Sequence, residues 1–171
     1  MKTLAFASLL PLALVGCTDD ADIGVESDPI QCMQTAAADM SGSVEYNGQT
    51  YNFENASPTL TRDTTGAYTT VSLWSSENPD TQRGNYLRFF FQCGAPENAS
   101  YDVVQPGPNQ QVNCPFEVTS SVAGSIEILP ATTGVMIVDQ TQGCLAGRFR
   151  VDLDNAAGSG SIGGWYSIPW Q

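Results

Sequence analysis

The sequence predicts an all-β domain, either an antiparallel β-sandwich or a jelly-roll-like fold of about ten short strands. Many segments alternate apolar and polar residues with a period of two, which is the spacing of a half-buried strand. Turn residues such as Asn47-Gly48 separate these segments, and no long amphipathic helix pattern occurs between them. We divide the chain into a leader at residues 1–16, a tether at 17–29 and a β-sandwich domain at 30–171.

The leader has the pattern of an export signal. Lys2 precedes an apolar run that is too short for a membrane-spanning helix. The cluster Leu14-Val15-Gly16-Cys17 at its end resembles the lipobox of bacterial lipoproteins. The resemblance implies that the Cys17 sulfur carries diacylglycerol, that the leader is cut before Cys17, and that the new amine is acylated, for example by palmitate. The alternative is an ordinary signal peptide with a chance cysteine.

The tether that follows is acidic and contains few apolar residues. Its like charges repel one another, so we expect an extended segment that holds the domain away from the membrane. Thr18 follows the cysteine, and the first aspartate is Asp19. By resemblance to lipoprotein sorting signals, this order favours the outer membrane of the bacterial envelope.

The domain begins with an ambiguous segment, Ile30–Met40, which can form one short helix or an irregular lead-in held by Cys32. Residues 44–46 and 51–53 then alternate on either side of Asn47-Gly48. Both turn residues tolerate positive φ, so this segment predicts a β-hairpin.

The remaining strands are predicted from the same alternation between turn-rich segments. Ser75–Gly84, Gly94–Ser100 and Gln105–Asn109 are the clearest turns or loops, since they collect Gly, Pro, Asn and Ser. The strand candidates are Ala67–Trp74, Asn85–Cys93, Tyr101–Val104, Val112–Thr119, Ser125–Leu129, Val135–Thr141, Cys144–Leu153 and Ser161–Ile168.

Three glycine-led segments late in the chain resemble those of small β-sandwich lipoproteins of unknown function. They are Gly124-Ser125-Ile126-Glu127-Ile128, Gly147-Arg148-Phe149-Arg150-Val151 and Gly163-Gly164-Trp165-Tyr166. The resemblance implies the sandwich fold and identifies no site residue.

The charge of the chain limits its partners. Cleavage after residue 16 leaves 155 of the 171 residues, with five arginines and all 18 acidic residues, a side-chain charge of −13. Such a chain offers no basic patch to neutralise phosphates, so we expect no nucleic-acid binding. The same negative charge disfavours electrostatic binding to anionic lipid. We therefore expect the covalently attached lipid to make the membrane contact.

Four cysteines follow the anchor, and an even number in an exported chain suggests two disulfides. Cys32, Cys93, Cys114 and Cys144 allow three pairings. We favour Cys93–Cys114, across the segment between two strands, together with Cys32–Cys144, from the start of the domain to its late strands. A zinc site is disfavoured, because the chain has no CxxC-type pair after the anchor and no histidine.

The candidate chemistry is sparse. A serine or cysteine nucleophile assisted by histidine is excluded, since the chain contains no histidine. Asp152 and Asp154 share one face of a strand and form a candidate acid–base pair for glycoside hydrolysis. With Asn155 they also offer oxygen ligands suited to calcium. The simpler interpretation is a solvated strand face and a polar loop, so we expect neither an enzyme nor a cofactor or bound metal.

Aromatic residues are the clearer binding signal. Trp74, Trp165 and Trp170 are candidates for stacking on sugar rings, although strand tryptophans also pack in cores. We therefore expect a non-catalytic binding or structural module whose partner is an envelope protein or envelope component. The alternatives are a carbohydrate-binding module with exposed aromatics and a carboxylate-based hydrolase.

Overall fold

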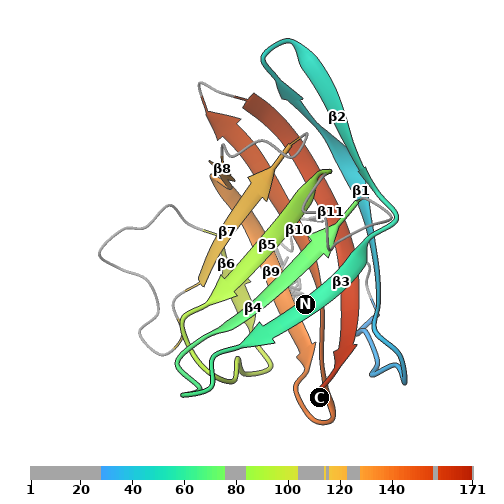
Figure 1. Cartoon of the computed structure of the whole chain (residues 1–171), viewed down its shortest axis with the longest axis vertical. Coiled ribbons are helices and arrows are strands. Elements are labelled where there is room, and N and C mark those ends of the chain that lie inside the picture. Colours follow the sequence, from blue (N-terminus) through green and yellow to red (C-terminus); the bar gives the residue numbers. More distant parts are fainter. Residues whose placement is uncertain are drawn as a thin grey trace, which may run out of the picture.

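The computed structural model describes residues 28–75, 84–103, 114, 116–122, 128–155 and 158–170. These residues form eleven strands and no helix, and the strands make two antiparallel sheets that pack against each other (Figure 1). The predicted all-β sandwich is confirmed. Within the same residues, no helix has the length and apolar character needed to cross a bilayer. The leader, Cys17 and tether residues 18–27 lie outside the described residues, as do 76–83 and 105–109 of the predicted turns.

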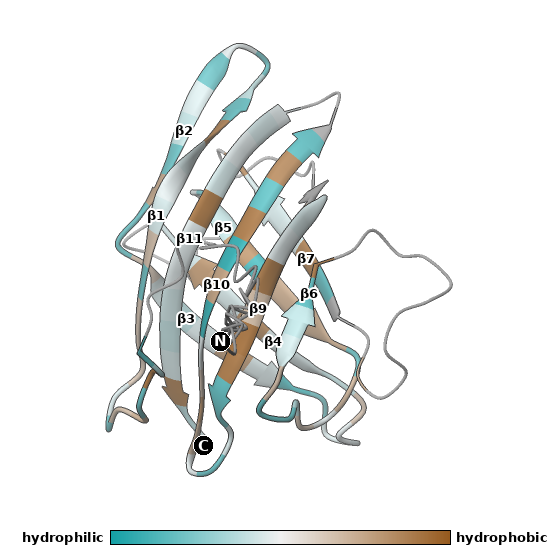
Figure 2. Ribbon diagram, turned by 180° about the vertical axis from the view of Figure 1, so that it is seen from behind, coloured by the Kyte–Doolittle hydropathy of each residue, from teal (hydrophilic) through white to brown (hydrophobic). Residues whose placement is uncertain are grey.

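The larger sheet has six strands in the order β2-β1-β11-β10-β9-β6. β10 and β11 pair along their whole length, from Cys144 opposite Pro169 to Asn155 opposite Gly158. Its strands are β1 (Ala37–Tyr46), β2 (Gln49–Glu54), β6 (Ser100–Asp102), β9 (Thr133–Gln140), β10 (Cys144–Asn155) and β11 (Gly158–Pro169). Figure 2 shows hydrophilic and hydrophobic residues alternating along β10, as the sequence predicts for a half-buried strand.

The smaller sheet has five strands in the order β3-β4-β5-β7-β8. β5 lies in its middle, as predicted for the Phe-rich segment around Phe89. Its strands are β3 (Ser57–Arg62), β4 (Thr69–Trp74), β5 (Tyr86–Phe91), β7 (Phe116–Ser121) and β8 (Ile128–Pro130).

Two local features follow directly from glycines. Asn47 and Gly48 have φ of 51° and 74°, and they join β1 to β2 in the predicted hairpin. Gly160 and Gly164 of β11 face the backbone of β1, where an added Cβ would lie 2.1 Å and 2.2 Å from carbonyl oxygens. The two backbones can therefore approach closely, and the long strands curve around the core (Figure 1).

The structure adds one strand to those predicted and decides between the two alternatives for the start of the domain. Ser57–Arg62 is a strand that alternation does not predict, because it carries one large apolar residue and Pro58. A proline is tolerated there because β3 is an edge strand. Of the two alternatives for Ile30–Met40, the irregular lead-in is present rather than the helix: residues 28–36 are irregular and β1 starts at Ala37. Pairing of β1 with β11 overrides the helix propensity of the alanines.

The inner faces of both sheets form one core. The rings of Phe89 from β5 and Phe149 from β10 lie 4.8 Å apart across the sheet interface. Tyr166 is fully buried among them, and its hydroxyl donates a hydrogen bond to the sulfur of Met136 at 3.5 Å. A Cβ at Gly147 would lie 3.1 Å from this hydroxyl, so the glycine makes room for it. Burial of each such aromatic side chain contributes about 1.5–3 kcal/mol.

Both favoured disulfides are present. Cys32 and Cys144 have Cα atoms 5.7 Å apart and are separated by 112 residues. Cys93 and Cys114 have Cα atoms 5.2 Å apart and are separated by 21 residues. The first disulfide fixes the irregular lead-in, residues 28–36, to the start of β10.

Candidate functional site

The three candidate tryptophans do not meet in the fold. Trp74 ends β4, Trp165 lies in β11 of the other sheet, and Trp170 follows β11 at the end of the domain. Trp74 is 6% exposed and its ring packs 4.7 Å from that of Tyr86. This burial leaves Trp74 little surface for a ligand to stack on.

The other two tryptophans are half-buried in different surroundings. Trp165 faces outward between Arg148 of β10 and Asp39 of β1. The indole N–H of Trp170 donates to the Thr141 carbonyl at 2.8 Å, and the Arg62 guanidinium lies 4.7 Å from its ring centroid. Trp170 thus makes contacts that close one end of the sandwich.

The acidic candidates lie on the outer face of β10. Asp152 is 4.0 Å from Arg150 and accepts a hydrogen bond from the Thr133 hydroxyl at 3.3 Å. Asp154 is exposed, and Asn155 ends the strand. Across the described residues, no group of three or more His, Cys, Asp or Glu side chains is placed to hold a metal ion.

The outer face of the five-stranded sheet carries a different arrangement. Leu87 and Phe89 point into the core, so the alternate residues of β5 point outward. These outward residues, with their aromatic neighbours from β4 and the turn before it, form a set that we term the aromatic–arginine row. Its members are Tyr68, Trp74, Tyr86, Arg88 and Phe90.

Ring contacts hold the two ends of the aromatic–arginine row. Trp74 packs on Tyr86 at one end, and the rings of Tyr68 and Phe90 lie 5.4 Å apart at the other. Tyr68 is 37% exposed, one of two large hydrophobic residues that reach this level among the described residues. Arg88 lies between the two ends, its guanidinium carbon 5.1 Å from the Tyr86 ring centroid. The row therefore combines a buried tryptophan with half-buried and exposed aromatic rings around one positive charge.

Arg88 differs from the other described arginines in its partners. Among the described residues, its buried Nε–H donates no hydrogen bond, and no carboxylate lies within ion-pair distance of its guanidinium. The nearest acid by register is Glu117 of β7, opposite Phe90, and its carboxylate accepts a hydrogen bond from Gln92 at 3.0 Å. A charged donor without a partner costs free energy in the folded protein, so this geometry calls for an explanation.

The chain matches no family model, no curated protein and no solved structure. Its function is therefore inferred from its own residues.

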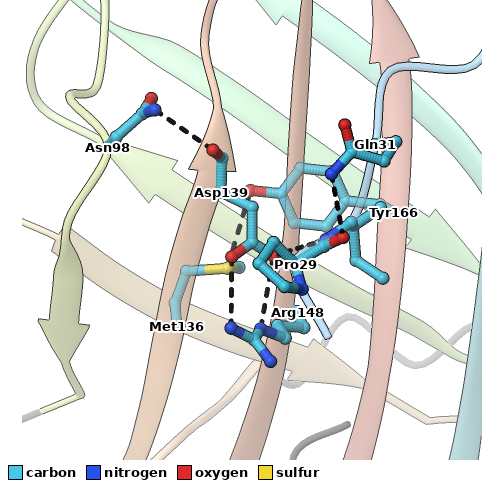
Figure 3. Close-up of polar contacts among 8 residues, drawn as sticks. Pro29, Gln31, Asn98, Met136, Asp139, Arg148 and Tyr166 are labelled. Atoms are coloured by element: carbon cyan, nitrogen blue, oxygen red, sulfur yellow. Dashed lines mark hydrogen bonds and ion pairs between the residues drawn. The ribbon is translucent and has the colours of Figure 1, made fainter. Parts of the chain in front are cut away.

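The outer face of the six-stranded sheet holds a cluster in which every charge is paired (Figure 3). The Asp139 carboxylate is 3.3 Å from Arg148 Nε, and it also accepts the Ile30 backbone N–H at 3.1 Å. The two side chains are 4% and 12% exposed. Asp139 lies where the β9–β10 register shifts, and such a bulge redirects a side chain.

This cluster anchors the lead-in. Beside it, the Met33 backbone N–H donates to the Ser167 hydroxyl at 2.9 Å, and Cys32 is bonded to Cys144. Burial raises the pKa of Tyr166 far above its ordinary value, and the negative charge of Asp139 raises this pKa further. The arrangement is structural: it fixes residues 28–36 across one outer face of the sandwich.

Sequence reasoning did not single out Arg88 or Phe90 as site residues. The signal was the alternation within Asn85–Cys93, which places residues 86, 88 and 90 on one face of the strand. That alternation predicts which residues point outward, but it does not reveal which arginine lacks an acidic neighbour.

Proposed function

We propose that this chain is a lipid-anchored lipoprotein of the bacterial envelope whose domain is a non-catalytic binding module. It binds an envelope component through the aromatic–arginine row. The single observation that carries this proposal is Arg88, a charged side chain that has no acidic partner among the described residues and is held among aromatic rings on an outer sheet face. Aromatic and arginine side chains are the residues most enriched at binding surfaces.

The attachment of the lead-in supports this use of the row. The lead-in is attached to the outer face of the six-stranded sheet by the Cys32–Cys144 disulfide and by the Asp139 hydrogen bond. The row lies on the other sheet, so the lead-in does not occupy it. The acidic pair on β10 is a poorer candidate for chemistry, because Asp152 is already engaged by Arg150 and Thr133.

The anchor is tested by a Cys17→Ser variant expressed in a bacterial host. We expect the wild type in the membrane fraction with an intact mass that includes acyl chains, and the variant in the soluble fraction. Two or three acyl chains supply stable attachment, whereas the chain after residue 16 carries a side-chain charge of −13 and is repelled by anionic lipid. A Cys17→Ser variant that stays in the membrane would contradict the proposed lipidation.

The binding role is tested by co-sedimentation of the full-length protein in detergent with isolated envelope polymers. A double variant, Arg88→Gln with Phe90→Ser, alters the row, and Arg150→Gln on the opposite outer face is the matched control. We expect retention by at least one polymer for the wild type and the control, with about tenfold weaker retention for the double variant at an unchanged thermal midpoint. Equal retention of the double variant, or retention of none of the proteins, would contradict the proposal.

A further inference from the structure

The unpartnered guanidinium at the centre of the aromatic–arginine row defines a ligand class. We infer that the row binds a glycan that carries an isolated carboxylate, with Arg88 pairing the carboxylate and Tyr86 and Phe90 contacting the neighbouring sugar rings. This inference rests on the proposed binding role of the row and names its ligand.

The charge on Arg88 is available to an external anion. Arg148 and Arg150 each lie beside a carboxylate, and the Arg62 guanidinium donates to the Gly94 carbonyl at 2.8 Å. Within the part of the chain that the structure describes, the contact of the Arg88 guanidinium is with the Tyr86 ring. Because Nε is its buried, unpartnered atom, the two terminal nitrogens are left to meet a carboxylate end-on.

The surroundings of Arg88 suit a sugar. Tyr86 and Phe90 lie two residues away on either side, about 7 Å along the strand, so a ligand paired with Arg88 extends over both rings. Across the strands, Arg88 is flanked by Ser72 of β4 and Thr119 of β7. Aromatic faces contact the C–H surfaces of sugar rings, and the half-buried Thr119 offers a hydroxyl to hydrogen-bond with them.

The topology disfavours an extended peptide at this position. A peptide that adds to a sheet as a strand needs an unpaired edge, but β5 is paired on both sides by β4 and β7. A ligand here makes side-chain contacts alone, and a rigid ligand loses less conformational entropy on binding than a flexible peptide does.

The overall charge selects among acidic glycans. The chain after residue 16, with a side-chain charge of −13, repels a densely charged polyanion, and the aromatic–arginine row contributes a single positive charge. The ligand that fits has one carboxylate flanked by uncharged sugars.

Two trisaccharides test this inference on the full-length protein in detergent. One has a central glucuronic acid between two neutral sugars, and the other is the same molecule with the carboxyl group reduced to an alcohol. We expect the wild type to bind the acidic form about tenfold or more tightly than the reduced form, because an ionised hydrogen bond is lost on reduction. Arg88→Gln removes this preference, Phe90→Leu weakens binding of both forms, and Arg150→Gln behaves as the wild type.

The outcomes separate this inference from the proposed function. Equal affinity of the wild type for both trisaccharides, or no binding of either, would overturn the inference that the ligand is a carboxylate-bearing glycan. Retention of the wild type on envelope polymers would still support the proposed binding role. Tighter, Arg88-dependent binding of an aspartate-rich pentapeptide would overturn it in favour of a peptide ligand. Each comparison is made between proteins with the same thermal midpoint, so loss of binding reports on the row rather than on folding.

Discussion

The two outer faces of the sandwich use arginine in opposite ways. On the six-stranded sheet, Arg148 and Arg150 each lie beside an aspartate, and the lead-in covers part of the face. On the five-stranded sheet, Arg88 lies among aromatic rings, and no described residue gives it a carboxylate or hydrogen-bond partner. The same residue type, placed by the same strand alternation, is structural on one face and available for binding on the other.

The candidate site is distinguished by an arginine that lacks an acidic partner among the described residues, and not by the presence of charge alone. A chain with 18 acidic residues can neutralise an arginine on almost any surface. An arginine left unpaired in such a chain carries a cost in stability, and binding sites are where proteins commonly retain such costs.

The largest expected effects concern the disulfides, which differ between the two regions. Removing Cys32 and Cys144 together, by Ala substitutions, releases a constraint over 112 residues and is expected to cost roughly 4.8 kcal/mol. The matched Cys93/Cys114 double variant releases 21 residues and is expected to cost roughly 3.3 kcal/mol. Urea unfolding of both variants measures this order, and a larger loss for Cys93/Cys114 would contradict it.

The paired arginine gives the next effect. Arg148→Met leaves the Asp139 carboxylate, 4% exposed, without its guanidinium partner, so we expect a loss of about 3–5 kcal/mol. Arg150→Met is the control, because its partner Asp152 is 42% exposed and the pair is screened by water; its loss stays within about 1 kcal/mol. Urea unfolding at neutral pH measures the loss of unfolding free energy in both variants. Similar losses would contradict the expectation that the buried ion pair contributes more stability than the exposed one.

A smaller effect on the free energy of unfolding depends on pH and comes from Tyr166, which is buried beneath the outer face of the six-stranded sheet. The raised pKa of Tyr166 keeps its hydroxyl protonated in the folded state, while in the unfolded chain it titrates at its ordinary value of 10.0. The unfolded state therefore binds fewer protons above pH 10, and the free energy of unfolding falls by up to about 1.4 kcal/mol per pH unit from this group. Tyr166→Phe removes this part of the slope in unfolding measured from pH 9 to 11; an unchanged slope would contradict the assignment.

Much of the fold could be predicted from the sequence because alternation and turn chemistry are local. The hairpin at Asn47-Gly48 and the alternation along β10 follow from residues that are close together in the chain. The edge strand at Ser57–Arg62 could not be predicted this way, because its pairing with β4 rather than its own apolar content holds it in the sheet. The disulfide pairing was favoured from strand order, and the structure confirms it.

The candidate site was less predictable because it depends on neighbours across strands. Asp139 reaches Arg148 through a bulge and reaches Ile30 across 109 residues, so no local pattern reveals that this charge is paired. The environment of Arg88 is also set by its neighbours across the strands, and these are Ser72 and Thr119 rather than acidic residues. Trp74 was a plausible ligand contact in the sequence, but its packing on Tyr86 buries it.

The smallest expected change in stability is also the most direct test of the contrast between the two faces. Arg88→Met replaces an unpaired charge, whose Nε is buried, by an apolar side chain of similar length. If Arg88 is held for a ligand rather than for the fold, urea unfolding of this variant gives a free energy equal to or higher than that of the wild type. A loss of about 2 kcal/mol or more would show that Arg88 stabilises the sandwich as Arg148 does, and would contradict the account.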